Sequence, residues 1–406
     1  MLSERVSTGD NGRTASSRLL KEFARVIRAD IKPELLTWAR ERAGLETAAL
    51  THRFPKLEAW QKGTVTPTLK QVEDFAKATH TPVGFLFLKE PPVEEIPIPD
   101  FRTIRNKAIS RPSPDLLDMI YVCQQRQEWY RDFARSERAS ALSFVGSASL
   151  NNSVETTAEI MRHALGFDIE ERRRIPTWSD ALRIFIAQAD EAGIMVMCSG
   201  VVLNNNTRRL DPEEFRGFAL SDSHAPLVFI NGADTKAAQM FTLAHELAHI
   251  WLGQSAVSDA QASLVPEHQV ERWCNNVAAE LLVPLAVLKQ EYDRGLDLRV
   301  SLARLARRFK VSTLVILRRI HDAGGLTREE FWREYDKELK RILAISKKSG
   351  GNFYLTQAAR VSKRFARALV VSTLEGQTLH RDAFRMLGFA KLETFRKLGR
   401  SLGVIG

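Results

Sequence analysis

Cysteine is scarce in this sequence. The 406 residues include three cysteines, and no two of them form a CxxC pair: Cys123, Cys198 and Cys274. An odd number of widely spaced cysteines indicates neither a disulfide framework nor a cysteine zinc site. We therefore expect a protein of a reducing compartment, the cytoplasm.

Long apolar runs are also absent. The most apolar windows, such as residues 281–288, are short and soon reach charged residues, well below the ~20 residues that a membrane-spanning helix requires. The N-terminal stretch up to Ser17 is polar and lacks the apolar region of a secretory signal. We expect neither membrane insertion nor export.

Apolar residues are nevertheless sufficient for a folded protein, at 44% of the chain against 27% charged residues. A length of 406 residues predicts two or three folded units, at ~100 to 200 residues per domain. The net charge of +10 is uneven, because residues 299–400 contain 24 Lys and Arg against 9 Asp and Glu, a local +15. Such a region favours a nucleic acid or an acidic protein partner, although cations along helices are also common on solvated faces.

Proline, glycine and apolar periodicity divide the chain into successive segments. Three runs read as strands, at residues 193–198, 215–220 and 225–231, and helical patterns return from Ala237 and continue to the end. The fold class is therefore α+β, with a small sheet in the middle and mainly helical modules on both sides. The predicted segments are a disordered tail (1–18), short helices (19–90), a Pro-rich linker and connecting helix (91–150), a core (151–290), a helical subdomain (291–345) and a basic helical region (346–406).

The most specific motif is His245-Glu246-Leu-Ala-His249, in a stretch that predicts a helix. Residues four apart lie on one helical face, so both imidazoles can bind one ion, with Glu246 beside it. The neighbouring Leu, Ala, Ile and Trp residues predict a buried helix, in which two His and a Glu without a partner would cost several kcal/mol. A shared metal ion removes that cost.

A catalytic zinc takes three protein ligands and leaves one position for water. The longer HExxHxxGxxH pattern is excluded, because position 252 is Leu and position 255 is Ser. Glu271, at the start of the next predicted helix, is the preferred third ligand, with His268 as the alternative. Asn275 lies one turn later on the same face, where it can accept a hydrogen bond from a ligand imidazole.

These residues predict hydrolysis of a peptide bond. Zn²⁺ is the expected metal, with Mn²⁺ as an alternative, and Glu246 is the base that takes a proton from water and passes it to the leaving amine. His224, between two predicted strands, is a candidate stabiliser of the transition state, the other reading being an ordinary surface histidine. We also expect an extended substrate to pair with the strand at 227–231 by edge addition.

The motif and its surroundings resemble the ImmA/IrrE family of metallopeptidases. The similar stretches are Phe-Thr-Leu-Ala before His245, Val-Glu271-Arg-x-x-Asn275-x-x-Ala-Ala-Glu-Leu-Leu-Val-Pro, Arg216-Gly-Phe-Ala-Leu and Ala225-Pro-Leu-Val-Phe-Ile-Asn. The resemblance covers residues 153–284 and implies a zincin-like core with gluzincin-type ligands, His245, His249 and Glu271. It also implies a bacterial or phage stress or defence peptidase that cuts a partner repressor or antitoxin.

Two stretches resemble DNA-binding helices. Residues 31–88 are similar to an Xre-type helix-turn-helix, but with a shortened recognition helix that leaves few side chains for base edges: Lys56, Gln61 and Lys62. A second such pattern lies at 302–320. Contact with DNA, a purely structural or protein-binding role, and a homodimer all stay open. The alternative function is a DNA-binding regulator with a metal sensor, but sensing needs only three ligands, so the presence of Glu246 favours the enzyme.

Overall fold

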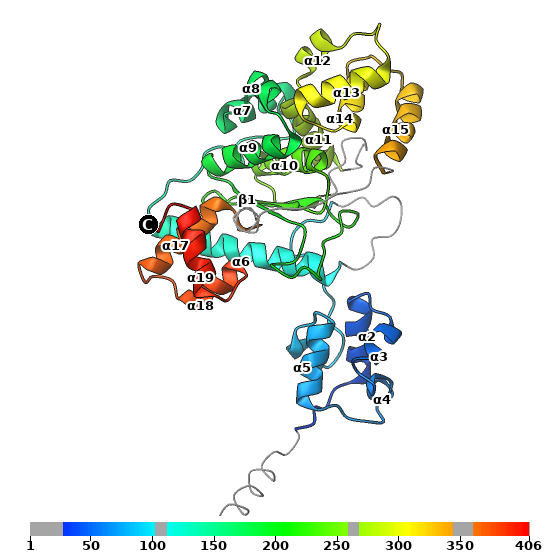
Figure 1. Cartoon of the computed structure of the whole chain (residues 1–406), viewed down its shortest axis with the longest axis vertical. Helices are drawn as coiled ribbons and strands as arrows, with labels where there is room; N and C mark the ends of the chain where they lie inside the picture. The colour runs from blue at the N-terminus through cyan, green and yellow to red at the C-terminus, as the bar shows by residue number, and fades with distance from the viewer. Residues whose placement is uncertain (1–26, 102–111, 259–267, 344–359, 406) are drawn as a thin grey trace, which may run out of the picture. The chain divides into compact units, whose positions relative to one another are not determined.

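The computed structural model describes residues 27–101, 112–258, 268–343 and 360–405, and the chain forms two compact units (Figure 1). Of the described residues, 27–95 and 112–114 belong to the N-terminal unit, and 96–101 and those from 115 onwards belong to the larger one. The tail predicted at 1–18 lies outside the described residues. None of the described helices is both long and apolar enough to cross a membrane.

The N-terminal unit is a small bundle of short helices. Pro33 occupies the first turn of its first helix, and the last α-helix starts at a reciprocal capping box between Thr68 and Gln71. Its core contains aromatic residues such as Phe54, Trp60 and Phe75. The elements are α2 (Pro33–Arg42), α3 (Thr47–Thr51), α4 (Leu57–Gln61), α5 (Leu69–Ala78) and the 3₁₀ helix η1 (Val83–Phe87).

The larger unit is built around one four-stranded sheet in the order β1-β3-β2-β4. Its strands are β1 (Met195–Ser199), β2 (Gly217–Leu220), β3 (Leu227–Asn231) and β4 (Ala256–Ser258). The β1–β3 pair is parallel, whereas β2 pairs antiparallel with both β3 and β4. The structure therefore agrees with an α+β fold in which three of the four strands match the predicted runs.

Helices cover both faces of this sheet (Figure 1). One face carries α7 (Val154–Leu165), α8 (Ile169–Arg174), α9 (Trp178–Glu191), α10 (Lys236–Leu252), α11 (Gln269–Leu282), α12 (Leu285–Glu291), α13 (Leu298–Phe309), α14 (Thr313–Asp322) and α15 (Arg328–Leu343). The other carries α6 (Pro114–Ser136), α17 (Lys363–Leu374), α18 (His380–Leu387) and α19 (Leu392–Ser401).

Two apolar cores result from the alternation of side chains along the strands. Val196, Val228 and Ile230 pack into the core under α10, whereas Met197 and Phe229 pack into the core under α6 and α17. Residues of α13 and α14 belong to the same core as α10. Buried residues on both sheet faces explain why β3 reads as a continuous apolar run and not as an alternating one.

Two expectations about the sheet were wrong. Helical structure does not continue without interruption after Ala237, because β4 follows α10. The strand at 227–231 cannot receive a substrate by edge addition, because β1 and β2 already occupy its two sides. A three-residue strand is too short to show alternation, and the position of a strand within a sheet depends on pairings distant in sequence.

Candidate metal centre

Helix α10 carries the HExxH motif through the middle of the larger unit. The Thr235 side chain caps its first turn by accepting a hydrogen bond from the Ala238 amide, and Gly253, at a φ of +71°, ends it in the left-handed conformation that glycine adopts most easily. Every residue from Gln239 to Trp251 is buried. A helix buried all round fixes its polar side chains rigidly, because packed neighbours surround each of them.

Three ligand atoms converge beside this helix. His245 Nε2 and His249 Nε2 are 3.1 Å apart. Glu271 lies in the first turn of α11, with its Oε2 3.2 Å from His245 Nε2 and its Oε1 2.9 Å from His249 Nε2. Among the described residues, these three form the group that could hold a metal ion, and all three are buried. The structure thus brings together two ligands from one helix and a third from the next.

The arrangement fits a tetrahedral metal. Ligand atoms about 2.0 to 2.1 Å from zinc would be about 3.4 Å from one another in a tetrahedron, close to the observed separations. Glu271 Oε1 lies 2.9 Å from His249 Nε2 yet makes no hydrogen bond with it or with any other described residue. These atoms are thus close enough together to share one cation.

Asn275 orients one of the two imidazoles. The Nδ1–H of His245 donates to Asn275 Oδ1 at 2.9 Å, which turns the Nε2 lone pair towards the cluster. The predicted partner of a ligand imidazole is thus in contact with it. His249 differs, because its buried Nδ1 has no hydrogen-bond partner among the described residues.

Charges within the cluster shift its pKa values in opposite directions. Burial favours the neutral form of Glu271, but the two adjacent imidazoles overcome it and hold the pKa of this carboxyl well below its usual range. Burial likewise opposes protonation of His245, yet the Glu271 carboxylate raises its pKa, whereas for His249 burial prevails and the pKa is lowered. The cluster thus favours an ionised Glu271 and a neutral His249, whereas His245 holds a proton more strongly than a free imidazole does.

Glu246 has a different environment from the ligands. It is fully buried, and neither carboxylate oxygen has a hydrogen-bond partner among the described residues. Burial raises its pKa to about 8, with a smaller contribution from the charge of Glu271, against the opposing effects of His245 and the nearby Ser258 hydroxyl. Room for the carboxylate comes from Gly217, where a Cβ would lie 3.1 Å from Glu246 Oε1. A buried carboxylate beside a candidate metal site has the position of a general base.

The structure does not bring His224 to this cluster. His224 lies in the turn between β2 and β3, where Ser223 Oγ is 3.1 Å from its Nδ1. That turn adjoins the Leu220–Leu227 pair, whereas Gly217, beside Glu246, pairs with Ile230 at the opposite end of the hairpin. His224 is close in sequence to both β2 and β3, but the pairing of these strands decides which end of the hairpin lies beside Glu246. His224 lies at the other end.

The structure also places a serine hydroxyl at the cluster that the sequence did not predict. Ser258, the last residue of β4, is fully buried, and its Oγ lies 3.4 Å from His249 Nε2. No motif indicates this serine, since its strand is only three residues long. Cys274, also buried on α11, is not part of the ligand group, and burial raises the pKa of its thiol well above the usual value.

The second helix-turn-helix pattern, at 302–320, falls on α13 and α14. Arg319 of α14 pairs with Glu280 of α11 in the interior and donates to the Val283 carbonyl at 3.0 Å. From Thr313 to His321 every residue of α14 is buried or partly buried. A recognition helix needs an exposed face to enter a DNA groove, so this packing favours a structural role.

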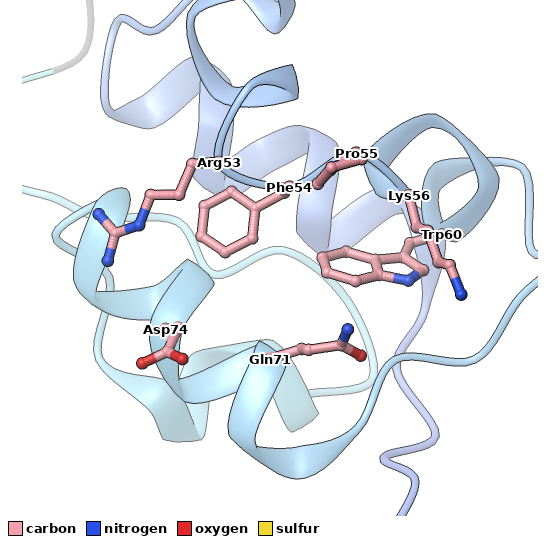
Figure 2. A pocket seen from close by; sticks show the side chains of 7 residues that line it. All are labelled: Arg53, Phe54, Pro55, Lys56, Trp60, Gln71 and Asp74. Atoms are coloured by element: carbon pink, nitrogen blue, oxygen red, sulfur yellow. The ribbon is translucent and has the colours of Figure 1, made fainter.

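The N-terminal unit contains a separate hollow of about 240 Å³ (Figure 2). Figure 2 shows the rings of Phe54 and Trp60 on one side of it and the side chains of Gln71 and Asp74, from α5, facing them. The predicted recognition helix corresponds to α4, which has only five residues, with Lys56 and Lys62 exposed at its two ends. DNA binding by this unit stays a prediction.

Comparison with known proteins agrees with this geometry. Residues 189–321 match the Peptidase_M78 family, the IrrE N-terminal-like domain, and residues 361–401 match a domain of unknown function, DUF8813. A 106-residue stretch is 36% identical to the radiation response metalloprotease IrrE of Deinococcus radiodurans, covering 25% of this chain and 32% of that protein. The chain thus spans about a third of the length of this relative. The part of the chain that carries the His-His-Glu cluster is thus similar to the IrrE N-terminal-like domain of metallopeptidases.

Proposed function

We propose that this protein is a zinc-dependent metalloendopeptidase that cleaves a partner repressor or antitoxin in a bacterial or phage stress or defence response. The observation that carries the proposal is Glu246, an unpartnered, fully buried carboxylate next to three converging ligands of which it is not one. The stress context comes from the relative, whose name describes a radiation response metalloprotease. The family match supports the peptidase reaction.

Each residue of the cluster has a distinct task in this reaction. His245, His249 and Glu271 hold the metal, and Asn275 keeps His245 in the tautomer that presents Nε2. A zinc ion held by these residues would supply the Lewis acidity that peptide hydrolysis needs. Glu246 takes the proton from a water molecule and delivers it to the leaving amine.

The rival function is a DNA-binding regulator that uses the same metal site as a sensor. Metal binding needs the three ligands alone, and a sensor gains nothing from a buried carboxylate without a partner, which is costly to maintain. Mn²⁺ in place of Zn²⁺ is compatible with either function. The two functions differ in whether loss of Glu246 has any consequence when the metal is retained.

The decisive experiment compares wild type with Glu246→Gln. The full-length proteins, loaded with Zn²⁺ or Mn²⁺, are incubated with the proteins encoded by the neighbouring genes, and the products are identified by mass spectrometry. Glu246→Gln should retain its metal and lose at least ~10²-fold in cleavage rate, because the general base is gone. Equal rates would contradict the mechanism. Absence of cleavage by metal-loaded wild type would favour the sensor.

A further inference from the structure

The outer edge of β4 is the part of the sheet that leads to the metal cluster. In the strand order β1-β3-β2-β4, only β1 and β4 have a side that no other strand of this sheet covers. Ser258 ends β4 with its Oγ 3.4 Å from His249 Nε2. An extended polypeptide paired with β4 would therefore run beside the metal ligands, using the edge amides and carbonyls that strands offer to a partner chain.

A segment of the same chain already lies on this edge. The Val257 amide donates to the Pro99 carbonyl at 2.9 Å, and the Phe101 amide donates to the Val257 carbonyl at 3.0 Å. Asp100 thereby forms a parallel bridge with Val257. Ile96 and Ile98, which precede Pro99, pack against the apolar core under α6. We call residues 96–101 the strap.

The strap ends with an aromatic ring on the metal site. The ring of Phe101 is stacked with that of His249, with centroids 6.3 Å apart and planes 14° from parallel, and its centroid is 5.2 Å from that of His268. Centroid distances below 7 Å are those of favourable aromatic pairs. The ring of Phe101 thus covers the His249 imidazole, while its backbone amide is hydrogen-bonded to the edge strand β4.

We propose that the strap is a tethered occupant of the peptide-binding edge, and that a polypeptide substrate reaches the metal only when the strap leaves β4. This inference rests on the proposed peptidase function and adds its regulation. The contacts of Phe101 also define the substrate class, an extended and unfolded segment with a large apolar side chain that replaces the Phe101 ring beside His249 and His268. If the strap is closed about ten times as often as open, the apparent affinity for such a segment is lowered about tenfold.

The test measures binding without turnover. All proteins are full-length, zinc-loaded and carry Glu246→Gln, and the probe is fluorescein-labelled, unfolded casein followed by anisotropy. Phe101→Ala should bind casein about tenfold more tightly than the parent, because the ring no longer holds the strap closed. The matched control is Phe87→Ala, which removes a phenylalanine that is 48% exposed at the end of η1 and should bind like the parent. Phe101→Leu keeps an apolar side chain, so its casein affinity should lie between those of the parent and Phe101→Ala. It replaces Phe101→Ala in the test if that variant does not fold.

Hydrogen exchange gives a second readout. In the parent, casein should expose the Phe101 amide to exchange while the Val257 amide stays protected, because the substrate replaces the strap on β4. Equal casein affinity of Phe101→Ala and the parent, or an unchanged Phe101 amide in the presence of bound casein, would overturn the proposal. If Phe101→Ala binds casein more tightly but zinc-loaded proteins with Glu246 intact hydrolyse nothing, the strap is supported and the peptidase function fails. If wild type hydrolyses casein and Phe101→Ala changes neither rate nor affinity, the function stands and the strap is refuted.

Discussion

Asn275 accepts a hydrogen bond from His245 Nδ1 at 2.9 Å, and it lies one helical turn beyond Glu271 on α11. One helix thus provides both a proposed metal ligand and the residue that orients a proposed ligand of the neighbouring helix. Because both side chains project from the same face of α11, any shift of this helix relative to α10 would disturb two contacts of the metal site at once.

Removing Asn275 should weaken metal binding without abolishing it. Asn275→Ala deletes the acceptor that fixes the His245 tautomer, so zinc affinity should fall about 10- to 100-fold. Competition with a chromophoric chelator measures this affinity. The adjacent Asn276 is exposed, and Asn276→Ala should bind zinc like wild type. Equal affinities for the two variants would show that the hydrogen bond does not affect the metal.

The proposed ligand assignment predicts how substitution of each of four residues changes zinc binding. His245→Ala and His249→Ala should each lose the stoichiometric zinc, and Glu271→Gln should bind it more weakly because a neutral amide oxygen replaces a charged one. His268→Ala should keep one zinc per chain, since this exposed residue is not part of the ligand group. Metal analysis after gel filtration gives the answer. Zinc loss in His268→Ala with retention in Glu271→Gln would show that His268, and not Glu271, is the third ligand.

Gly217 should tolerate no side chain. A Cβ there would lie 2.6 Å from Thr242 Cγ2 and 2.8 Å from the Phe229 carbonyl oxygen, besides its contact with Glu246. Gly217→Ala should therefore destabilise the fold by roughly 1 to 3 kcal/mol and displace the catalytic carboxylate. Urea titration and cleavage rates measure the two effects. Gly84→Ala meets no atom within 4 Å and is the control. A Gly217→Ala protein with wild-type stability would refute the tight packing.

Glu246 should make the stability of the metal-free protein depend on pH. Burial raises its folded-state pKa to about 8, above the usual 4.5, so its stabilising contribution is full below pH 4.5 and is lost as the pH rises through 8. Glu246→Gln does not titrate. In the presence of chelator, the melting temperature of Glu246→Gln minus that of wild type should therefore increase steadily from pH 5 to pH 8.5. A difference that is constant across this range would contradict the raised pKa.

The candidate metal ligands could be named from the sequence largely because their signal is local. His245 and His249 are four residues apart, so helical periodicity alone places them on one face, and the capping and apolar pattern of α10 is contained in the same stretch of sequence. Glu271 and Asn275 were inferred in the same way, as two residues one turn apart on a second helix. What the sequence could not provide is the packing of that helix against α10, which brings Glu271 within 3.2 Å of His245 Nε2.

The sequence by itself determined the α+β class and three of the four strands, and it brought forward the candidate residues of the site, because each depends on a periodic pattern within one short stretch. Only the tertiary structure decided that β3 lies inside the sheet, that β4 is an edge and that His224 lies at the far end of the hairpin. It also decided that Phe101 covers His249, a contact between residues almost 150 positions apart. Strand order and edge occupancy depend on pairing between distant segments, and no local pattern of side chains encodes which of them will meet.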